Sequence, residues 1–264
     1  MSAIASVTPR VTLRAAFAHV LILTRRNLMG LRHDPEQMAA MVLMPIMFLV
    51  LFVFVFGGAL AGSTQAYLQF ALPGVMTQGI VWSSMSTGAY LNIDISKGVF
   101  DRIRSLPIAR SAPLIGQILG DTIRYGLGMA ITLGFGMMLG FHVETGLPQT
   151  LAAAAVMVGF ALAFCWIMIL LGLLMKSPAG VQVAATLVVF PLTFASSIFV
   201  PTRTMPGWLQ AWAGISPISL LSDTVRGLLV GGQVLEPALK LLVWSVAVVA
   251  VFAPLSVTVY RRRV

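Results

Sequence analysis

The sequence predicts an all-α membrane protein with six transmembrane helices, and its composition and its apolar runs carry this prediction. Hydrophobic residues make up 58% of the 264 residues, and only 9% are charged. A soluble domain usually carries about a quarter charged residues, so this chain has too few to cover a surface that faces water. Mean hydropathy is +0.95, and the apolar residues fall into runs of about 20 or more, the length that a helix needs to cross a bilayer.

Six runs meet this length requirement, and we expect each of them to be one spanning helix. They cover residues 38–60, 67–92, 114–141, 151–175, 180–200 and 239–260. Four runs contain an internal proline, which membrane helices tolerate where neighbouring groups satisfy the freed carbonyls; these are Pro45, Pro73, Pro191 and Pro254. The six helices form one membrane domain, residues 38–264, which follows a cytoplasmic N-terminal segment, residues 1–37.

The distribution of basic residues orients these spans. Most of the 17 lysines and arginines lie on one side of the predicted membrane: Arg10, Arg14, Arg25, Arg26, Arg32, Lys97, Arg102, Arg104, Arg110, Lys176, Arg261, Arg262 and Arg263. Cytoplasmic loops carry such an excess of positive charge, so both termini are expected in the cytoplasm of a bacterium, with the chain in the inner membrane. Because the cations lie in short segments between apolar runs, the net charge of +9 does not indicate nucleic acid binding.

The N-terminal segment is expected to contain an amphipathic helix that lies on the membrane surface. Leu13, Phe17 and Leu28 fall near one face of this helix, and Arg14 and Arg25 fall near the opposite face. Arginines on such a helix lie among lipid headgroups while the apolar face enters the acyl boundary. A topology anchor with no further role explains the pattern equally well.

The cytoplasmic loop between the second and third spans has the pattern of a short amphipathic helix. Val99, Ile103 and Leu106 follow helical spacing, and Pro107 ends the pattern. Such a helix, held away from the bilayer, suits a partner protein with a groove. The alternative is a solvated loop whose positive charge serves topology alone.

The outer connection, residues 201–238, is long and apolar. Pro201, Pro206 and Pro217 divide it into pieces too short to cross the membrane, and Trp208 and Trp212 share one helical face. We expect one or two half-helices that re-enter the outer leaflet, which is possible where protein buries their ends. An ordinary interfacial loop anchored by tryptophan is the alternative.

Two groups of polar residues lie inside the predicted spans. Asp121 and Arg124 are three positions apart on the third span and can neutralise each other, either as a structural pair or in transport. The second span carries small and polar residues that favour helix packing over a substrate-lining role: Thr77, Gln78, Ser83, Ser84, Ser86, Thr87 and Gly88. No span has a carboxylate near its middle, which argues against a carrier coupled to protons or sodium.

No enzyme motif occurs in the sequence. None of the three lysines, Lys97, Lys176 and Lys240, follows a glycine, so the phosphate-binding loop G-x-x-x-x-G-K-[ST] is absent. The single cysteine, Cys165, lies in an apolar run and indicates a packing residue rather than a metal site. The chain by itself is therefore expected to be no enzyme and to bind no cofactor.

Two stretches make the sequence similar to the permease subunits of type-2 ABC exporters, in particular the daunorubicin-resistance branch. The first is the cytoplasmic loop, KGVFDR followed by SLPI (residues 97–102 and 105–108). The second runs from SSIFVP (196–201) through MPGWLQ (205–210) to SP and DTVRG (216–217 and 223–227). The order of spans, the basic N-terminal helix and the apolar outer connection agree with this resemblance along nearly the whole chain.

The resemblance implies roles for named residues. The cytoplasmic loop corresponds to a coupling helix that docks on the ATPase subunit, with Gly98, Asp101, Arg102 and Pro107 as coupling candidates. The outer half-helices help to close the exit, with these gate candidates: Pro201, Pro206, Trp208 and Pro217. An acidic residue commonly precedes the glycine in this family, and Lys97 stands there instead.

The resemblance also implies a partner and an energy source. A separate nucleotide-binding subunit would bind ATP and Mg²⁺, and a second copy or a related permease would complete the membrane unit. The hypothesis is export of a hydrophobic or amphipathic substrate, a drug or a lipid. A membrane scaffold or channel that is not driven by ATP is the rival, and a secondary carrier ranks third.

Overall fold

The computed structural model describes residues 35–98 and 112–263, and these residues form a bundle of long helices without a β-strand among them. The all-α prediction is therefore confirmed for this part of the chain. The predicted N-terminal interfacial helix and the coupling candidates Asp101, Arg102 and Pro107 lie outside the described residues.

Each of the six predicted ranges contains helix. In chain order the helices are α2 (Pro35–Leu51), the π-helix η1 (Phe52–Phe56), α3 (Gly57–Ala61), α4 (Thr64–Ser96), α6 (Ala112–Met138), α7 (Leu147–Leu174), α8 (Pro178–Phe194) and α11 (Leu235–Arg263). The outer connection holds the 3₁₀-helix η2 (Thr202–Thr204), α9 (Gly207–Ala213) and α10 (Pro217–Val230). All four prolines predicted within the spans lie inside helices.

Three helical segments in the described part of the chain are both long enough and apolar enough to cross a bilayer: Val42–Ala61, Leu147–Leu174 and Leu235–Tyr260. The helix α4 has 33 residues and α6 has 27, so both have sufficient length. The helix α8 has 17 residues and ends at Phe194, six residues before the predicted end of the fifth span. The chain is an integral membrane protein.

Local sequence signals set where several helices begin. The Ser63 hydroxyl accepts a hydrogen bond from the Ala66 amide at the start of α4 (3.1 Å), and the Ser177 hydroxyl accepts from the Gly180 amide at the start of α8 (3.2 Å). A side-chain oxygen at this position satisfies an amide that has no partner within the helix. Pro178 follows directly as the first residue of α8, where its missing N–H costs no hydrogen bond.

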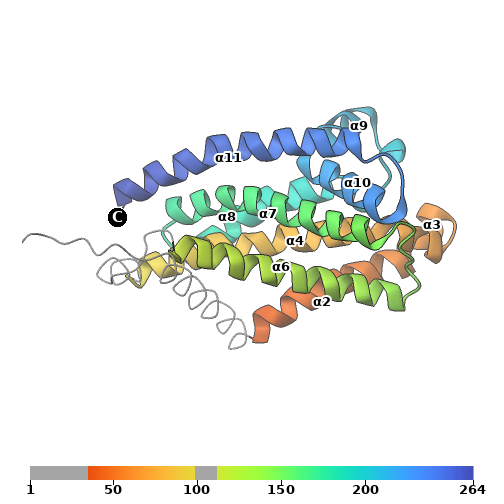
Figure 1. The fold of residues 1–264 in the computed structure, drawn as a ribbon, viewed down its shortest axis with the longest axis horizontal. Helices are drawn as coiled ribbons and strands as arrows, with labels where there is room; N and C mark the ends of the chain where they lie inside the picture. The colour runs from red at the N-terminus through yellow and green to blue at the C-terminus, as the bar shows by residue number, and fades with distance from the viewer. Residues whose placement is uncertain (1–34, 99–111, 264) are drawn as a thin grey trace, which may run out of the picture.

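The long helices run side by side, and the outer half-helices gather at one end of the bundle (Figure 1). The helices α3, α9 and α10 lie at that end, while α11 ends at the opposite end of the bundle. The helix α4 is central, because it contacts α2, α6, α7, α8 and α10.

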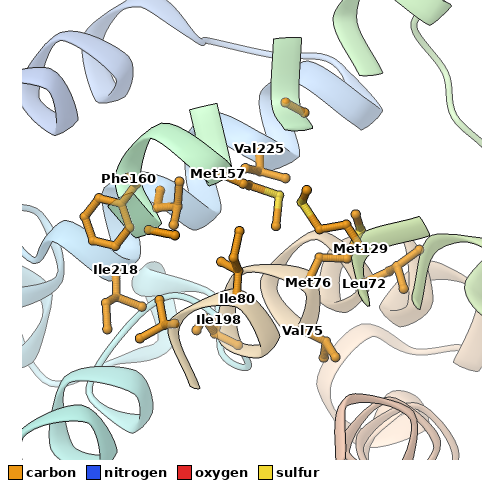
Figure 2. Packing of buried hydrophobic residues seen from close by; sticks show 14 of the residues in the cluster. Leu72, Val75, Met76, Ile80, Met129, Met157, Phe160, Ile198, Ile218 and Val225 are labelled. Carbon is orange, nitrogen blue, oxygen red and sulfur yellow. The ribbon is translucent and has the colours of Figure 1, made fainter. Parts of the chain in front are cut away.

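The buried core joins α4 to the helices around it. Figure 2 shows side chains from α4, α6, α7, α10 and the segment after α8 packed together: Leu72, Val75, Met76, Ile80, Met129, Met157, Phe160, Ile198, Ile218 and Val225. Much of the surface of α4 faces protein, which explains why this helix carries more polar residues than a helix that faces lipid.

The polar residues of the second predicted span contribute to packing, but only in part as expected. The hydroxyls of Thr77, Ser83, Ser84 and Ser86 donate to carbonyls of α4 itself, three or four residues earlier. These four hydroxyls therefore form their hydrogen bonds within α4 and not with a neighbouring helix. The hydroxyl of Thr87 does reach another helix, as described below.

Candidate functional site

The predicted coupling segment begins where α4 ends. The Lys97 amide donates to the Ile93 carbonyl (3.0 Å), and the Gly98 amide donates to the Ile95 carbonyl (3.1 Å). Gly98 has φ +62°, a left-handed conformation that glycine adopts without steric cost and that commonly ends helices. Gly98 therefore has the conformation that commonly follows a helix end, and its part in coupling stays a prediction.

The predicted ion pair between Asp121 and Arg124 forms on α6, and both side chains are buried. Asp121 also accepts a hydrogen bond from the hydroxyl of Thr87 on α4 (3.2 Å). A buried charge is tolerated when it is paired and hydrogen-bonded. The carboxylate therefore joins α6 to α4.

A third helix contributes to the same cluster through Cys165 on α7. The Cys165 sulfur lies 3.3 Å from the hydroxyl of Tyr125 and 3.6 Å from the hydroxyl of Thr87. The sequence indicated a purely apolar packing residue, whereas the thiol also takes part in polar contacts among three helices. Nothing in the sequence near Cys165 signals this, because its partners come from α4 and α6.

The guanidinium of Arg124 faces two tyrosine rings and a small cavity. Its central carbon lies 5.7 Å from the ring centre of Tyr125 and 6.0 Å from that of Tyr90. Its Nε has no hydrogen-bond partner. Arg124 lines a cavity of about 10 Å³ together with Pro45 and Ser83, a volume that holds about one water molecule. This geometry favours the structural interpretation of the pair.

Each predicted gate proline stands at the start of a helix in the outer connection. Pro201 precedes η2, Pro206 precedes α9, and Pro217 is the first residue of α10. Trp208 and Trp212 both lie on α9, where Trp208 is 74% exposed and Trp212 is 38% exposed. The described structure thus divides the connection at the three prolines, as the sequence predicted.

The helix α10 is a short buried helix. It has 14 residues, about 21 Å at 1.5 Å per residue, which is less than the ~30 Å hydrocarbon core. Most of its residues are buried against α4, α7 and α11. This geometry supports the half-helix interpretation of the outer connection.

Arg226 on α10, which sequence reasoning did not single out, binds three separate parts of the structure. Its Nε donates to the Phe70 carbonyl on α4 (3.1 Å), and one terminal nitrogen donates to the Asp223 carboxylate (2.6 Å). The other terminal nitrogen donates to the Ser197 carbonyl (3.0 Å) and to the Ser222 hydroxyl (3.2 Å). The guanidinium carbon lies 4.0 Å from the centre of the Phe70 ring.

The segment after α8 depends on these side chains, since Ser197 and its neighbours are buried but not helical. The Ser197 amide donates to the Ser219 hydroxyl (3.1 Å), and the Ser197 hydroxyl donates to Asp223 (2.9 Å). The Tyr67 hydroxyl donates to the Phe199 carbonyl (2.6 Å). Buried backbone groups outside a helix need such partners, which explains how α8 can end before residue 200.

A sequence signal for this network was available. Ser219, Asp223 and Arg226 are spaced by four and three residues, so they lie on one face of a helix that is otherwise apolar. A cation on an apolar helix of a membrane protein is a candidate functional residue. Their partners on α4 and after α8 are distant in sequence and could not be deduced from spacing.

Comparisons with known proteins agree with this architecture. The family model described as ABC-2 type transporter matches residues 18–230. The daunorubicin resistance ABC transporter permease protein DrrB1 of Streptomyces coeruleorubidus is 42% identical over 238 residues, which cover 90% of this chain and 84% of the relative.

Two further relatives extend the comparison. The Mycobacterium tuberculosis protein named "Probable doxorubicin resistance ABC transporter permease protein DrrC" is 30% identical over 251 residues, 94% of this chain and 90% of the relative. The putative transport permease ycf38 of Cyanophora paradoxa is 25% identical over 219 residues, 78% of this chain and 72% of the relative. The chain therefore belongs to the ABC-2 type transporter family, among permeases of ABC transporters that are named for drug resistance.

Proposed function

We propose that this chain is the membrane-spanning half of an ATP-driven exporter that moves a hydrophobic or amphipathic substrate outward. A separate nucleotide-binding subunit binds ATP and Mg²⁺ and hydrolyses the ATP. Two membrane domains, identical or related, pair in a bacterial inner membrane, and each engages one ATPase subunit. The observation that carries the proposal is the family match over residues 18–230, which includes both the coupling candidates and the outer half-helices.

The length of α4 supports contact with a cytosolic partner. Its 33 residues span about 50 Å at 1.5 Å per residue, whereas the hydrocarbon core is ~30 Å thick. We propose that the extra length lies at the cytosolic end of α4 and that Gly98 and the coupling candidates Asp101, Arg102 and Pro107, which follow α4 in the sequence, face the ATPase subunit. A ligand drives a conformational change only if it binds one of the two states more tightly. In this proposal ATP is that ligand, and closure of the ATPase subunits around it would push on the coupling segment.

Six crossings and cytoplasmic termini form part of this proposal. The segments α2–α3, α4, α6, α7 and α11 each have the length to cross, and α8 is completed by residues 195–200. Lys97 and Lys176 then lie on the cytoplasmic side and Arg203 lies outside, in agreement with the excess of positive charge on the inner side.

The names of the relatives and the apolar character of the bundle support the proposed substrate class. Two relatives are named for resistance to daunorubicin and to doxorubicin. A drug of this kind is one candidate cargo, and a lipid is the other. The outer candidates Pro201, Pro206, Trp208 and Pro217 would help to close the exit after release.

The test is transport in inside-out membrane vesicles that contain this chain and a co-expressed ATPase subunit, with fluorescent daunorubicin as the probe. We expect ATP-dependent uptake, and loss of uptake in Asp101→Ala and Arg102→Ala while the ATPase subunit still copurifies. Arg203→Ala, which removes an exposed cation on the outer side, is the control and should transport normally. Flux that needs neither ATP nor the ATPase subunit would instead support the channel.

A further inference from the structure

The attachments at the two ends of α10 differ from those along the face that carries Ser219, Asp223 and Arg226. Before its start, the Trp244 indole of α11 donates to the Ile215 carbonyl (2.8 Å). At its end, the Thr145 hydroxyl donates to the Leu228 carbonyl (2.6 Å), and the Glu144 amide donates to the Leu229 carbonyl (3.0 Å). These contacts tie α10 to α11 and to the loop between α6 and α7.

Arg226, in the second half of α10, makes a different connection, to α4 and to the segment after α8. Its partners there are the carbonyls of Phe70 and Ser197, and its ring contact is Phe70. Ser219 and Asp223 bind Ser197 from the same face of α10. The side of α10 that faces α4 and the end of α8 is therefore held by one polar network, whereas its ends are held by other elements.

The chemistry of arginine suits this position. A guanidinium carries five donors in a planar fork and stays charged, so it can bind several fixed acceptors at once. Here it binds one carboxylate, two backbone carbonyls and one hydroxyl while only 17% of its side chain is exposed. A lysine ammonium is a compact point charge and cannot reproduce this geometry.

We infer that Arg226 is the positioning residue that keeps the outer half-helix α10 seated on α4 and on the segment after α8. Outward release of substrate then requires Arg226 to separate from the carbonyls of Phe70 and Ser197, while the end contacts of α10 act as pivots. This inference rests on the proposed exporter function, because it assigns Arg226 the role of holding the outer gate of that exporter closed.

The first test measures how well α10 is seated, and it needs neither ATP nor substrate. Thr224→Cys places a thiol at a fully buried position of α10, and native Cys165, buried on α7, reports general loosening of the bundle. Membranes that contain the full chain are treated with N-ethylmaleimide, and the modification rate of each thiol is read by peptide mass spectrometry.

We expect Arg226→Ala to speed modification at position 224 by about tenfold, which corresponds to about 1.4 kcal/mol, with Cys165 unchanged. Arg226→Lys should act in the same direction, because the charge remains but the fork is lost. If the Arg226→Ala protein does not accumulate in the membrane, the Arg226→Lys variant alone tests the inference. Arg203→Ala, in the same connection but exposed, should leave both rates unchanged.

The inference would be overturned if neither Arg226 variant speeds modification of the thiol at position 224. It would also be overturned if modification of Cys165 speeds up equally, because that result means general destabilisation of the bundle. A second readout, in vesicles with the ATPase subunit, is the amount of cargo moved per ATP. Arg226→Lys should lower this ratio while the rate of ATP hydrolysis is kept. If wild-type vesicles show no ATP-dependent transport, the proposed function fails, while the labelling result still reports on the seating of α10.

Discussion

At the scale of single residues, the buried pair of Asp121 and Arg124 shows how the protein keeps charge inside an apolar bundle. The two side chains are 11% and 9% exposed, and the Thr87 hydroxyl supplies a further partner for the carboxylate. A buried ion pair adds little stability compared with apolar residues of the same size, but removal of one partner leaves an uncompensated charge. Replacement of one partner should therefore destabilise the protein more than replacement of both partners by apolar residues.

Asp121→Ala is expected to lower the free energy of unfolding by about 3–5 kcal/mol, because Arg124 stays buried without its counter-charge. Reversible unfolding in mixed detergent micelles measures this change. Glu236→Ala is the matched control, since Glu236 also pairs with a cation on its own helix, Lys240, but both side chains are more than half exposed. Equal effects of the two substitutions would contradict the assigned role of the buried pair.

At the scale of helices, α4 and α7 approach each other closely because both carry glycine at the crossing. A Cβ added at Gly88 would overlap the Met168 carbonyl of α7, and one added at Gly172 would overlap the Gly88 carbonyl of α4. Small residues permit such approach between membrane helices. Asn92 strengthens the same interface, because its amide donates to the carbonyls of Gly172 and Met175 (both 2.9 Å) at the end of α7.

Gly172→Ala should destabilise the protein by about 1–3 kcal/mol, since backbone at the crossing must move to admit the methyl group. Gly159→Ala tests the same change on the same helix at a position where nothing lies within 4 Å of the added methyl. It should stabilise the protein by up to about 1 kcal/mol through helix propensity. Thermal unfolding in detergent compares the two, and a midpoint that falls equally in both would argue against close packing at Gly172.

At the scale of the whole molecule, the apolar runs and the positions of the prolines allowed much of the architecture to be predicted. The three prolines of the outer connection marked its helix starts, and the spacing of Asp121 and Arg124 marked their pair. Contacts between distant segments could not be predicted in this way. Arg226 binds Phe70, which is 156 positions away in the sequence. After the early end of α8, the side chains of Tyr67, Ser219 and Arg226 bind backbone groups of residues 197 and 199 that have no helical partner.

Three described segments are both long enough and apolar enough to cross a bilayer, whereas we propose six crossings. The two arrangements place the same residues on opposite sides. With six crossings, Lys97 faces the cytoplasm and Arg203 faces outward. If only α2–α3, α7 and α11 crossed, with the first crossing still directed outward, Lys97 would face outward and Arg203 would face the cytoplasm.

Lys97→Cys and Arg203→Cys, each in a Cys165→Ala background, separate these arrangements, since both positions are exposed and native Cys165 is the single cysteine of the chain. In intact cells stripped of any outer barrier, a membrane-impermeant maleimide should modify the thiol at position 203 and spare the thiol at position 97 until the membrane is opened. The reverse pattern would reject six crossings. It would also reject a cytoplasmic coupling segment, because residues 99–107 follow Lys97 directly and must lie on the same side of the membrane as the ATPase they are proposed to engage.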